Sequence, residues 1–187
     1  MNVYDFDKTI FAGDSTVSFY FFELRRHPLL IKHLPRQFPA FFAYFRKKID
    51  KTQMKERFYV FLSSIDTEKE VKLFWQKKKK KIYPFYLERK KSSDVIISAS
   101  PEFLLKVIAD ELNFNLIASR VSPVDGKYDG LNCYGDEKVS RFREVYGDAT
   151  IDEFYSDSLS DMPLAKLAKT AFKVKKGKII DNGFGLN

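Results

Sequence analysis

Acidic and hydroxyl side chains stand in this sequence where an apolar strand is expected to end. The first apolar run, residues 2–6, carries Asp5 and is followed by Asp7 and Thr9. Residues two apart in an extended segment point to the same side. One carboxylate of this pair could therefore attack a phosphorus atom while the other protonates the leaving oxygen.

Polar residues also follow two later apolar runs. Ser98 ends the second run, Asp157 and Asp161 follow a third, and Lys138 stands at the head of the helix expected before the third. Because ligand sites in α/β sheets lie beyond the C-terminal ends of the strands, we expect all these residues at one edge. Crowded carboxylates repel one another unless a cation neutralises them, and oxygen ligands suit Mg²⁺. Magnesium would polarise a bound phosphate, while lysine and hydroxyl groups would hold the remaining phosphoryl oxygens.

Strands and helices are expected to alternate along the chain. Apolar runs predict strands over residues 2–6, 94–97, 115–118, 150–155, 171–175 and 178–180, with the last two forming a hairpin. Helical periodicity predicts helices over residues 15–26, 52–62, 67–81, 101–112, 137–146 and 161–168. Pro28, Pro35 and Pro39 are expected to break the chain into short helical pieces, and residues 124–134 to form a hairpin or tight loop. This alternation predicts an α/β fold with a mainly parallel sheet covered on both faces.

The charge is divided unevenly. Between Tyr20 and Lys91 there are 20 Lys or Arg and 7 Asp or Glu, a net charge of +13, and the same segment holds 16 of the 30 aromatic residues. The remaining residues carry a net charge of −5. We therefore expect a basic, aromatic helical insertion, from about Asp14 to Lys91, resting over the C-terminal edge of an acidic core.

Composition excludes several other classes of site. The one cysteine, Cys133, excludes an intramolecular disulfide and a cysteine-built zinc site, and fits a reducing compartment. The longest uncharged aromatic stretch, residues 37–45, is much shorter than the roughly 20 apolar residues of a membrane span. Asp5 and Asp7 interrupt any apolar signal segment at the start. We therefore expect a cytoplasmic protein.

Four segments, in order, resemble the motifs of the haloacid dehalogenase (HAD) superfamily, in its phosphoserine-phosphatase-like branch. They are Asp5–Thr9 (DFDKT) after a strand, Ile96–Ser98 (IIS), Lys138 in GDEK, and Ser156–Asp161 (SDSLSD). Residues 125–130 (DGKYDG) are also typical of this branch. The resemblance covers nearly the whole chain, and it implies a three-layer, Rossmann-like core of residues 1–13 and 92–187 with a helical cap of residues 14–91.

The resemblance also implies a role for each matching residue. Asp5 would be the nucleophile and a magnesium ligand. Asp7 would be the acid for the leaving group and then the base for water, with its backbone carbonyl on the metal. Thr9 and Ser98 would bind phosphate oxygens, and Lys138 would neutralise charge on the nucleophile and the phosphate.

Three further aspartates complete the implied site. Asp157 would be a direct magnesium ligand, and Asp161 would support it through metal-bound water. Asp14 stands where this branch often has a glutamate that binds a substrate amino group. The reaction implied is Mg²⁺-dependent hydrolysis of a phosphate monoester through an aspartyl-phosphate intermediate.

The sequence departs from the phosphoserine enzymes of the family at several places. Ala99, Ser100 and Pro101 follow Ser98 where those enzymes usually have two glycines, and Ser156 stands where another glycine is usual. Only Arg36 and Arg57 are candidates for holding a substrate carboxylate. We therefore expect a small phosphorylated metabolite as substrate, with phosphoserine specificity not indicated.

Three alternatives remain open from the sequence. The residues from Phe38 to Lys48 combine aromatic and basic side chains, which favours contact with an anionic membrane and hydrolysis of a lipid phosphate. A phospho-accepting receiver module also uses a strand-end aspartate with a hydroxyl residue and a lysine, but it would lack a large insertion after its first strand. A nucleic-acid-binding protein fits the charge and the aromatic content, but the sequence contains no recognised nucleic-acid-binding motif. We therefore expect no nucleic acid as a partner.

Overall fold

The fold is built on one mainly parallel sheet. The structure, a computed structural model, describes residues 1–180 and 184–185 of the chain. Its strands lie in the order β3-β2-β1-β4-β5-β6. Their bounds are β1 (Asn2–Tyr4), β2 (Val95–Pro101), β3 (Asn115–Ser119), β4 (Ile151–Ser156), β5 (Ala168–Lys175) and β6 (Lys178–Ile180). All neighbours pair in parallel except β5 and β6, which are antiparallel. The predicted α/β class, the parallel sheet and the terminal hairpin are confirmed.

Eight α-helices and four short 3₁₀ turns accompany the sheet in the described residues. The helices are α1 (Ser15–Arg26), α2 (Leu34–Phe45), α3 (Lys51–Phe58), α4 (Thr67–Lys78), α5 (Pro84–Arg89), α6 (Glu102–Leu112), α7 (Asp136–Tyr146) and α8 (Met162–Ala165). The 3₁₀ turns are η1 (Pro28–His33), η2 (Tyr59–Ser64), η3 (Lys79–Lys81) and η4 (Leu159–Asp161). The first five helices and first three turns all lie between β1 and β2 in sequence.

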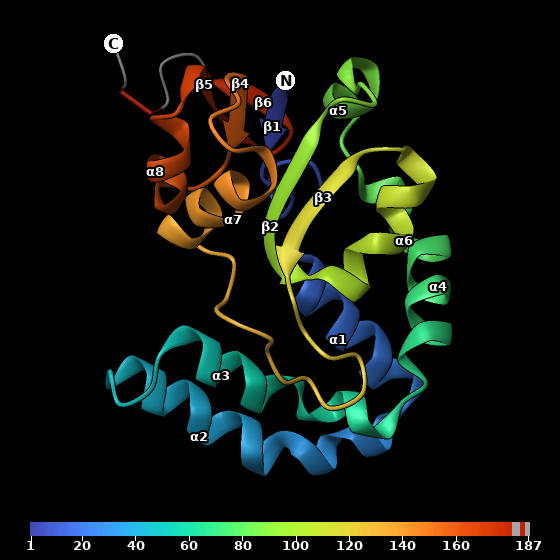
Figure 1. Cartoon of the computed structure of the whole chain (residues 1–187). Helices are drawn as coiled ribbons and strands as arrows, with labels where there is room; N and C mark the ends of the chain where they lie inside the picture. Colours follow the sequence, from blue (N-terminus) through green and yellow to red (C-terminus); the bar gives the residue numbers. More distant parts are fainter. Residues whose placement is uncertain (181–183, 186–187) are drawn as a thin grey trace.

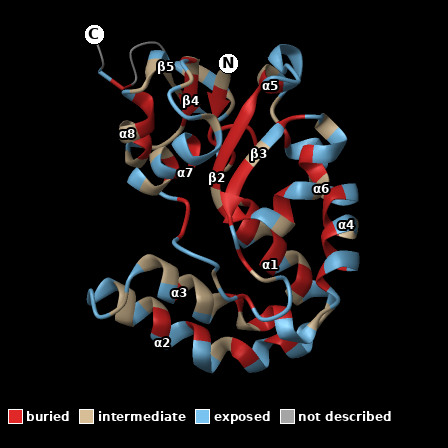
Figure 2. Ribbon diagram, viewed as in Figure 1, coloured by how far each residue is buried: buried red, intermediate tan, exposed pale blue. Residues whose placement is uncertain are grey.

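Side-chain alternation along the strands separates two apolar layers. Val3, Val95 and Phe154 belong to a core with α7 and α8, whereas Tyr4 and Ile96 belong to a second core on the other face. This is the pattern expected when successive side chains of a strand point to opposite faces and both faces are covered by helices. Figure 2 shows the result as buried strands with exposed helix surfaces outside them.

The helices between β1 and β2 take two different positions. Helices α1 and α4 pack with α6 on one face of the sheet. Trp75 of α4 donates a hydrogen bond to the carbonyl of Leu104 in α6, at 2.6 Å. By contrast, α2 and α3 lie beyond the C-terminal ends of β2 and β3 (Figure 1). The segment 14–91 therefore shares its apolar core with the sheet through α1 and α4, while α2 and α3 extend over the strand ends.

Some predicted boundaries differ from the structure. Helix α2 continues through Pro39 although a break was predicted there. The proline removes one intrahelical donor, but Gln37 donates to the carbonyl of Phe58 at 2.8 Å and accepts from the hydroxyl of Tyr20 at 2.9 Å, which ties α2 to its neighbours.

Two other predicted helices are shorter than expected. The helix predicted over 161–168 is only η4 and α8, because Ala168 already belongs to β5. The helix predicted over 52–62 ends at Phe58 and continues as the turn η2. Residues 124–134 form a loop with a single bridge between Val121 and Tyr128. In the described part of the chain, every helix is too short or too polar to cross a bilayer.

Candidate active site

The loop after β1 holds the first two aspartates at the sheet's edge. The backbone amide of Asp5 donates to the carbonyl of Tyr155 in β4 at 2.8 Å, which continues the sheet by one residue. The chain then turns back, with the amide of Phe11 bonded to the carbonyl of Phe6 at 2.9 Å. Lys8 lies between the aspartate pair and Thr9 with φ 61°, a left-handed conformation uncommon for a residue with a Cβ. The loop is therefore fixed by its own backbone hydrogen bonds.

Lys138 joins two carboxylates from different strand ends. Its Nζ atom lies 2.7 Å from Asp5 Oδ1 and 2.9 Å from Asp161 Oδ2, and the lysine is almost fully buried. Ser156 also donates to Asp161 Oδ2, at 2.7 Å. We call Asp5, Lys138 and Asp161 the rim cluster. It brings together residues that are more than 130 positions apart in the sequence.

The electrostatics of the rim cluster follow from burial and charge. Burial raises the pKa of Asp5 to about 7, although Lys138 opposes that shift. Burial alone would lower the pKa of Lys138, but the adjacent Asp5 and Asp161 together raise it above its ordinary value. The lysine therefore stays protonated and supplies a fixed positive charge beside the Asp5 carboxylate.

Asp7 is held by hydrogen bonds from two other segments. Its Oδ1 accepts from the backbone amide of Ser15 at the start of α1, at 2.6 Å, and its Oδ2 accepts from the hydroxyl of Ser100 at 2.5 Å. Burial and the nearby Asp14 raise the pKa of Asp7 to about 6, while the two hydrogen bonds act in the opposite direction. A carboxyl group that titrates near neutrality suits proton transfer in both directions.

Two of the predicted residues lie behind the cavity rather than in its wall. Thr9 donates to Asp5 Oδ2 at 3.4 Å and accepts from the amide of Asp157 at 2.9 Å. Ser98 is fully buried and accepts from the amide of Ser100 at 3.1 Å. Both hydroxyls therefore position residues that face the cavity, and their expected contact with phosphate stays a prediction.

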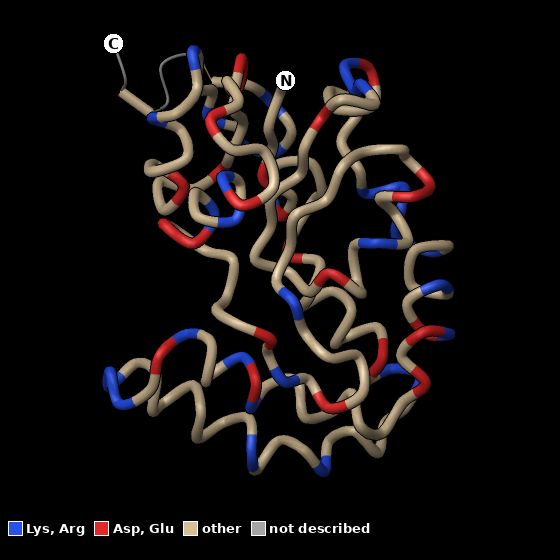
Figure 3. The backbone as a smooth tube through the Cα atoms, viewed as in Figure 1, with Lys and Arg blue, Asp and Glu red and all other residues tan. Residues whose placement is uncertain are grey.

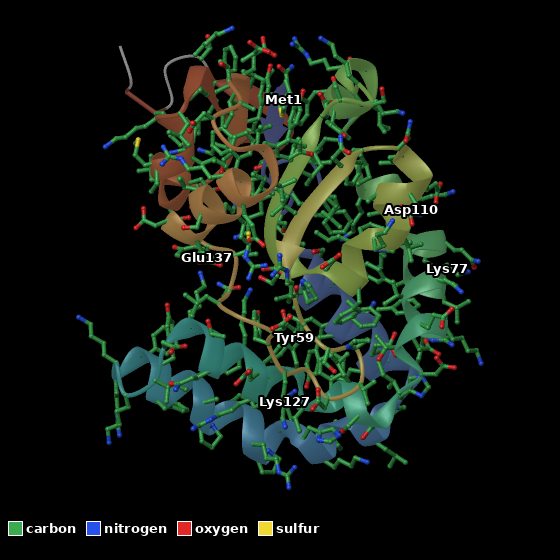
Figure 4. All side chains as sticks on the ribbon, in the orientation of Figure 1. Met1, Tyr59, Lys77, Asp110, Lys127 and Glu137 are labelled. Atoms are coloured by element: carbon green, nitrogen blue, oxygen red, sulfur yellow. The ribbon has the colours of Figure 1, made fainter. Side chains whose placement is uncertain are left out.

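The remaining six predicted residues line one cavity of about 370 Å³. They are Asp5, Asp7, Asp14, Lys138, Asp157 and Asp161. Asp14 also caps α1 by accepting from the amide of Val17 at 2.9 Å. The cavity lies between the C-terminal ends of the strands and α3, and Tyr59, which lines it, is labelled there in Figure 4.

The opposite wall of the cavity contains residues that the sequence analysis did not single out. Lys51 and Lys55 project from α3 into the cavity. Lys51 lies over the ring of Tyr134, 3.2 Å from its centroid, and Lys55 donates to the carbonyl of Ala99 at 2.7 Å and to Asn132 Oδ1 at 2.9 Å. Their i, i+4 spacing, with Lys51 just before and Lys55 within the helix predicted over 52–62, is a signal that could have identified them.

The two arginines considered as substrate ligands, Arg36 and Arg57, are exposed and do not line this cavity. Among the other lining residues, Val17, Phe41, Met54 and Phe58 are apolar, while Thr16, Tyr59 and Tyr134 add hydroxyl groups. A bound molecule would therefore meet carboxylates and Lys138 at the sheet, and two lysines with an apolar surface at α3.

The donor set at the strand ends fits a divalent cation. Asp161 Oδ1 is buried without a hydrogen-bond partner among the described residues, and burial raises the pKa of Asp157. Asp161 therefore keeps one oxygen, and Asp157 its carboxylate, available to a cation. Asp5 and Asp157 would supply carboxylate oxygens and Asp7 its backbone carbonyl, and hard oxygen ligands of this kind suit Mg²⁺. Within the described residues, a group of three His, Cys, Asp or Glu side chains whose ligand atoms all lie within 4.8 Å of one another occurs only at Glu23, His27 and Glu70, outside this cavity.

Comparison with known proteins gives one match over most of the chain. Residues 3–166 match the family model described as haloacid dehalogenase-like hydrolase. The Caulobacter vibrioides protein CicA is 34% identical over 92 residues, which are 45% of this chain and 41% of that protein. The chain therefore matches less than half of the length of this relative.

Two solved structures share the fold. A Bordetella pertussis Tohama I protein of unknown function superposes with a TM-score of 0.72 at 19% identity, covering 89% of this chain and 85% of the other. A phosphoserine phosphohydrolase-like protein from Francisella tularensis SCHU S4 superposes with a TM-score of 0.55 at 18% identity, covering 89% and 82%. At these identities the likeness is one of fold.

Proposed function

This chain belongs to the haloacid dehalogenase-like hydrolase family, and from that membership and the cavity's geometry we propose that it is a Mg²⁺-dependent phosphomonoester phosphatase. The observation that carries the proposal is the contact of Lys138 Nζ with Asp5 Oδ1 at 2.7 Å in a cavity beyond the strand ends. A buried lysine beside a carboxylate supports negative charge that moves from substrate to protein during phosphoryl transfer.

The first step of the proposed reaction transfers the phosphoryl group to the protein. A carboxylate oxygen of Asp5 attacks phosphorus, the bond from phosphorus to the ester oxygen breaks, and Asp7 gives its proton to the departing oxygen. Lys138 stays within hydrogen-bond distance of Asp5 and of the phosphoryl oxygens. The products are an alcohol and an aspartyl phosphate at Asp5.

The second step restores the protein. Asp7, now ionised, takes a proton from water, the water oxygen attacks phosphorus, and the bond to Asp5 breaks to release inorganic phosphate. Magnesium, held by Asp5, Asp157 and the carbonyl of Asp7, would offset the repulsion between the carboxylate and the phosphate. Asp161 holds Lys138 in place through its contact at 2.9 Å.

A single isosteric substitution tests this mechanism. Asp5→Asn removes the nucleophile and keeps its size, so turnover of para-nitrophenyl phosphate should fall to background while the melting temperature does not decrease. Asp148→Asn, at an exposed position, is the matched control and should keep full activity. Substantial turnover by the Asp5→Asn enzyme would refute the assignment.

The substrate class follows from the α3 wall of the cavity. Lys51 and Lys55 favour a substrate with a second anionic or carbonyl group, and the apolar residues beside them accommodate a short carbon skeleton. We therefore propose a small phosphorylated metabolite. A panel of phosphate esters that differ in the group distant from the phosphate would test it, because Lys51→Met should raise KM for the anionic members only.

One observation favours a second candidate, a lipid phosphate at an anionic membrane. Helix α2 exposes Phe38, Phe42 and Phe45 by 57%, 64% and 77%, at the i, i+4, i+7 spacing of one helix face. Arg46, Lys47 and Lys48 follow directly, and Figure 3 shows basic residues at this end of α2, next to α3. Aromatic residues beside a basic group suit the interface of an anionic bilayer.

Co-sedimentation with vesicles tests this second candidate. At physiological salt the protein should bind vesicles containing phosphatidylglycerol and not vesicles of phosphatidylcholine alone. The double variant F42S/F45S should lose binding, whereas Val145→Ser, which removes an exposed apolar side chain from α7, should not. Absence of binding to the anionic vesicles would leave the small metabolite as the substrate class.

A further inference from the structure

A second group of titratable side chains lies where α1 meets α4, outside the catalytic cavity. Glu23 lies in the last turn of α1, His27 caps the C-terminal end of that helix four residues later, and Glu70 is near the start of α4. One donor atom from each lies within 4.8 Å of the others. We call Glu23, His27 and Glu70 the helix cluster.

Glu23 is the unusual member of the helix cluster. It is 0% exposed, and neither of its carboxylate oxygens has a hydrogen-bond partner among the described residues. Burying a carboxyl group without a partner is costly, and burying an ionised one is far more so. Glu23 Oε2 lies 3.7 Å from His27 Nε2, which is too long for a hydrogen bond. Glu23 therefore receives no hydrogen bond from a donor among the described residues, and burial together with the adjacent Glu70 carboxylate raises the pKa of Glu23 to about 8.

Glu70 is already prepared as an anionic ligand. Arg26 donates to Glu70 Oε2 at 2.7 Å, and this hydrogen bond holds the pKa of Glu70 below its usual range. Glu70 Oε1 accepts a second, longer hydrogen bond from Arg26 Nη2 at 3.3 Å and lies 3.4 Å from His27 Nε2. The His27 side chain is 41% exposed as a whole, but its Nε2 atom is buried, so the candidate ligand atoms of His27 and Glu23 face a buried space.

From this geometry we propose that Glu23, His27 and Glu70 bind a divalent transition-metal ion, such as Zn²⁺, that joins α1 to α4. Zinc bonds of about 2.0–2.2 Å to nitrogen and oxygen place tetrahedral donors about 3.3–3.6 Å apart. The separations of 3.4 Å and 3.7 Å from His27 Nε2 to the two carboxylates match that spacing with little movement. An imidazole with two carboxylates is a donor set that suits zinc, and a water molecule would complete four-coordinate geometry.

The charges of the surrounding groups agree with a divalent ion. Two carboxylates and the Arg26 guanidinium carry a net charge of −1 when Glu23 is ionised, so an ion of charge +2 compensates the buried acid. The ion would fix the end of α1 against α4. Because the amide of Ser15 at the start of α1 bonds Asp7, the site would also stabilise the helix on which that contact depends.

The test uses metal-free full-length protein with Mg²⁺ in excess, so that the catalytic cavity is saturated. Zn²⁺ affinity is measured by competition with a chromogenic chelator, and Co²⁺ is added separately to record its visible absorption. Wild type should bind one equivalent of Zn²⁺ with a rise in melting temperature, and Co²⁺ should give the intense bands of four-coordinate geometry.

Three variants make the outcome decisive. Glu23→Gln and His27→Gln should each weaken Zn²⁺ binding by roughly tenfold or more and abolish the four-coordinate Co²⁺ spectrum. Glu68→Gln, which removes the same charge from an exposed position on the same turn of α4, should bind as wild type does. His27→Gln changes a partly exposed side chain and serves if Glu23→Gln does not fold.

Two results would overturn the proposal. One is wild-type protein that takes up no Zn²⁺ or Co²⁺ under saturating Mg²⁺; a higher melting temperature of Glu23→Gln would then assign the cluster to a shared proton. The other is unchanged affinity in both Glu23→Gln and His27→Gln.

Discussion

The rim cluster and the helix cluster contain similar charges but differ in where the cation lies. In the rim cluster the lysine is buried between the two carboxylates and contacts both, at 2.7 Å and 2.9 Å. In the helix cluster the arginine lies outside and bonds only Glu70, which leaves Glu23 buried and unpartnered. A buried pair of acids is therefore neutralised from within in one case and only partly in the other.

This difference indicates separate chemical uses. At the rim, the lysine occupies the space between the acids, so Asp5 faces the cavity with a fixed positive charge beside it. At the helix cluster, no lysine or arginine among the described residues lies between the two acids, and the distances from His27 to both carboxylates match those around a metal ion. The same residue types thus give a nucleophile in one place and a candidate ligand set in the other.

Removing the lysine of the rim cluster should change both turnover and stability more than any other substitution discussed below. Lys138→Met should lower turnover by about 10²–10³-fold, because the charge beside the nucleophile is lost. It should also lower the free energy of unfolding by about 3–5 kcal/mol, because two buried carboxylates lose their partner. Steady-state kinetics and chemical denaturation measure the two effects.

Arg26→Met is the matched substitution at the helix cluster, where the arginine side chain is 41% exposed. Turnover should stay at the wild-type level, and the loss of stability should be clearly smaller than for Lys138→Met. Equal losses in the two variants would remove the distinction between an internal and an external cation.

A smaller effect should separate the two clusters by metal. Asp157→Asn removes a proposed magnesium ligand, so the Mg²⁺ concentration that gives half-maximal activity should rise roughly tenfold or more. Glu23→Gln should leave that concentration unchanged, because the helix cluster does not line the catalytic cavity. Titration of chelator-treated enzyme with MgCl₂ provides the measurement, and a shift of the same size in both variants would contradict separate sites.

The rim cluster could be predicted because the ends of strands can be recognised in the sequence. A run of apolar residues followed by an acid locates a carboxylate at the sheet's edge, and parallel pairing brings such edges together. The predictions of Asp5, Asp157 and Asp161 at one edge needed no knowledge of side-chain packing. Ser100 was missed because the second strand was predicted to end at Ile97, whereas β2 continues to Pro101.

The helix cluster was not predictable in the same way. Glu23 and His27 are one turn apart, but on a surface helix this spacing is ordinary. Glu70 joins them only because α1 packs against α4, and the angle at which two helices cross depends on the side chains that interlock between them. The continuation of α2 through Pro39 was missed for a similar reason, since hydrogen bonds of Gln37 to Phe58 and Tyr20 are tertiary contacts.

The smallest effect concerns the lysines on α3 and depends on pH. Burial lowers the pKa of Lys55 to about 8, so its positive charge is lost as the pH rises through that value. For an anionic substrate, kcat/KM should then fall about fivefold above pH 8, which corresponds to ~1 kcal/mol for a partly screened charge pair. Lys55→Gln should lower kcat/KM below pH 8 and remove this part of the pH profile.

As the pH rises, the contribution of Lys55 to the free energy of unfolding should change in the opposite direction to kcat/KM. Between pH about 8 and the ordinary lysine pKa of 10.5, the unfolded chain holds a proton on Lys55 that the folded chain has released. The unfolded state binds more protons there, so the contribution of Lys55 to the free energy of unfolding rises with pH. Below pH 8 both states are protonated and the contribution is constant.

A profile in which substrate affinity and the Lys55-dependent part of stability fall together would mean that Lys55 is not the group that titrates. A wild-type pH profile retained in Lys55→Gln would assign the substrate contact to Lys51 instead.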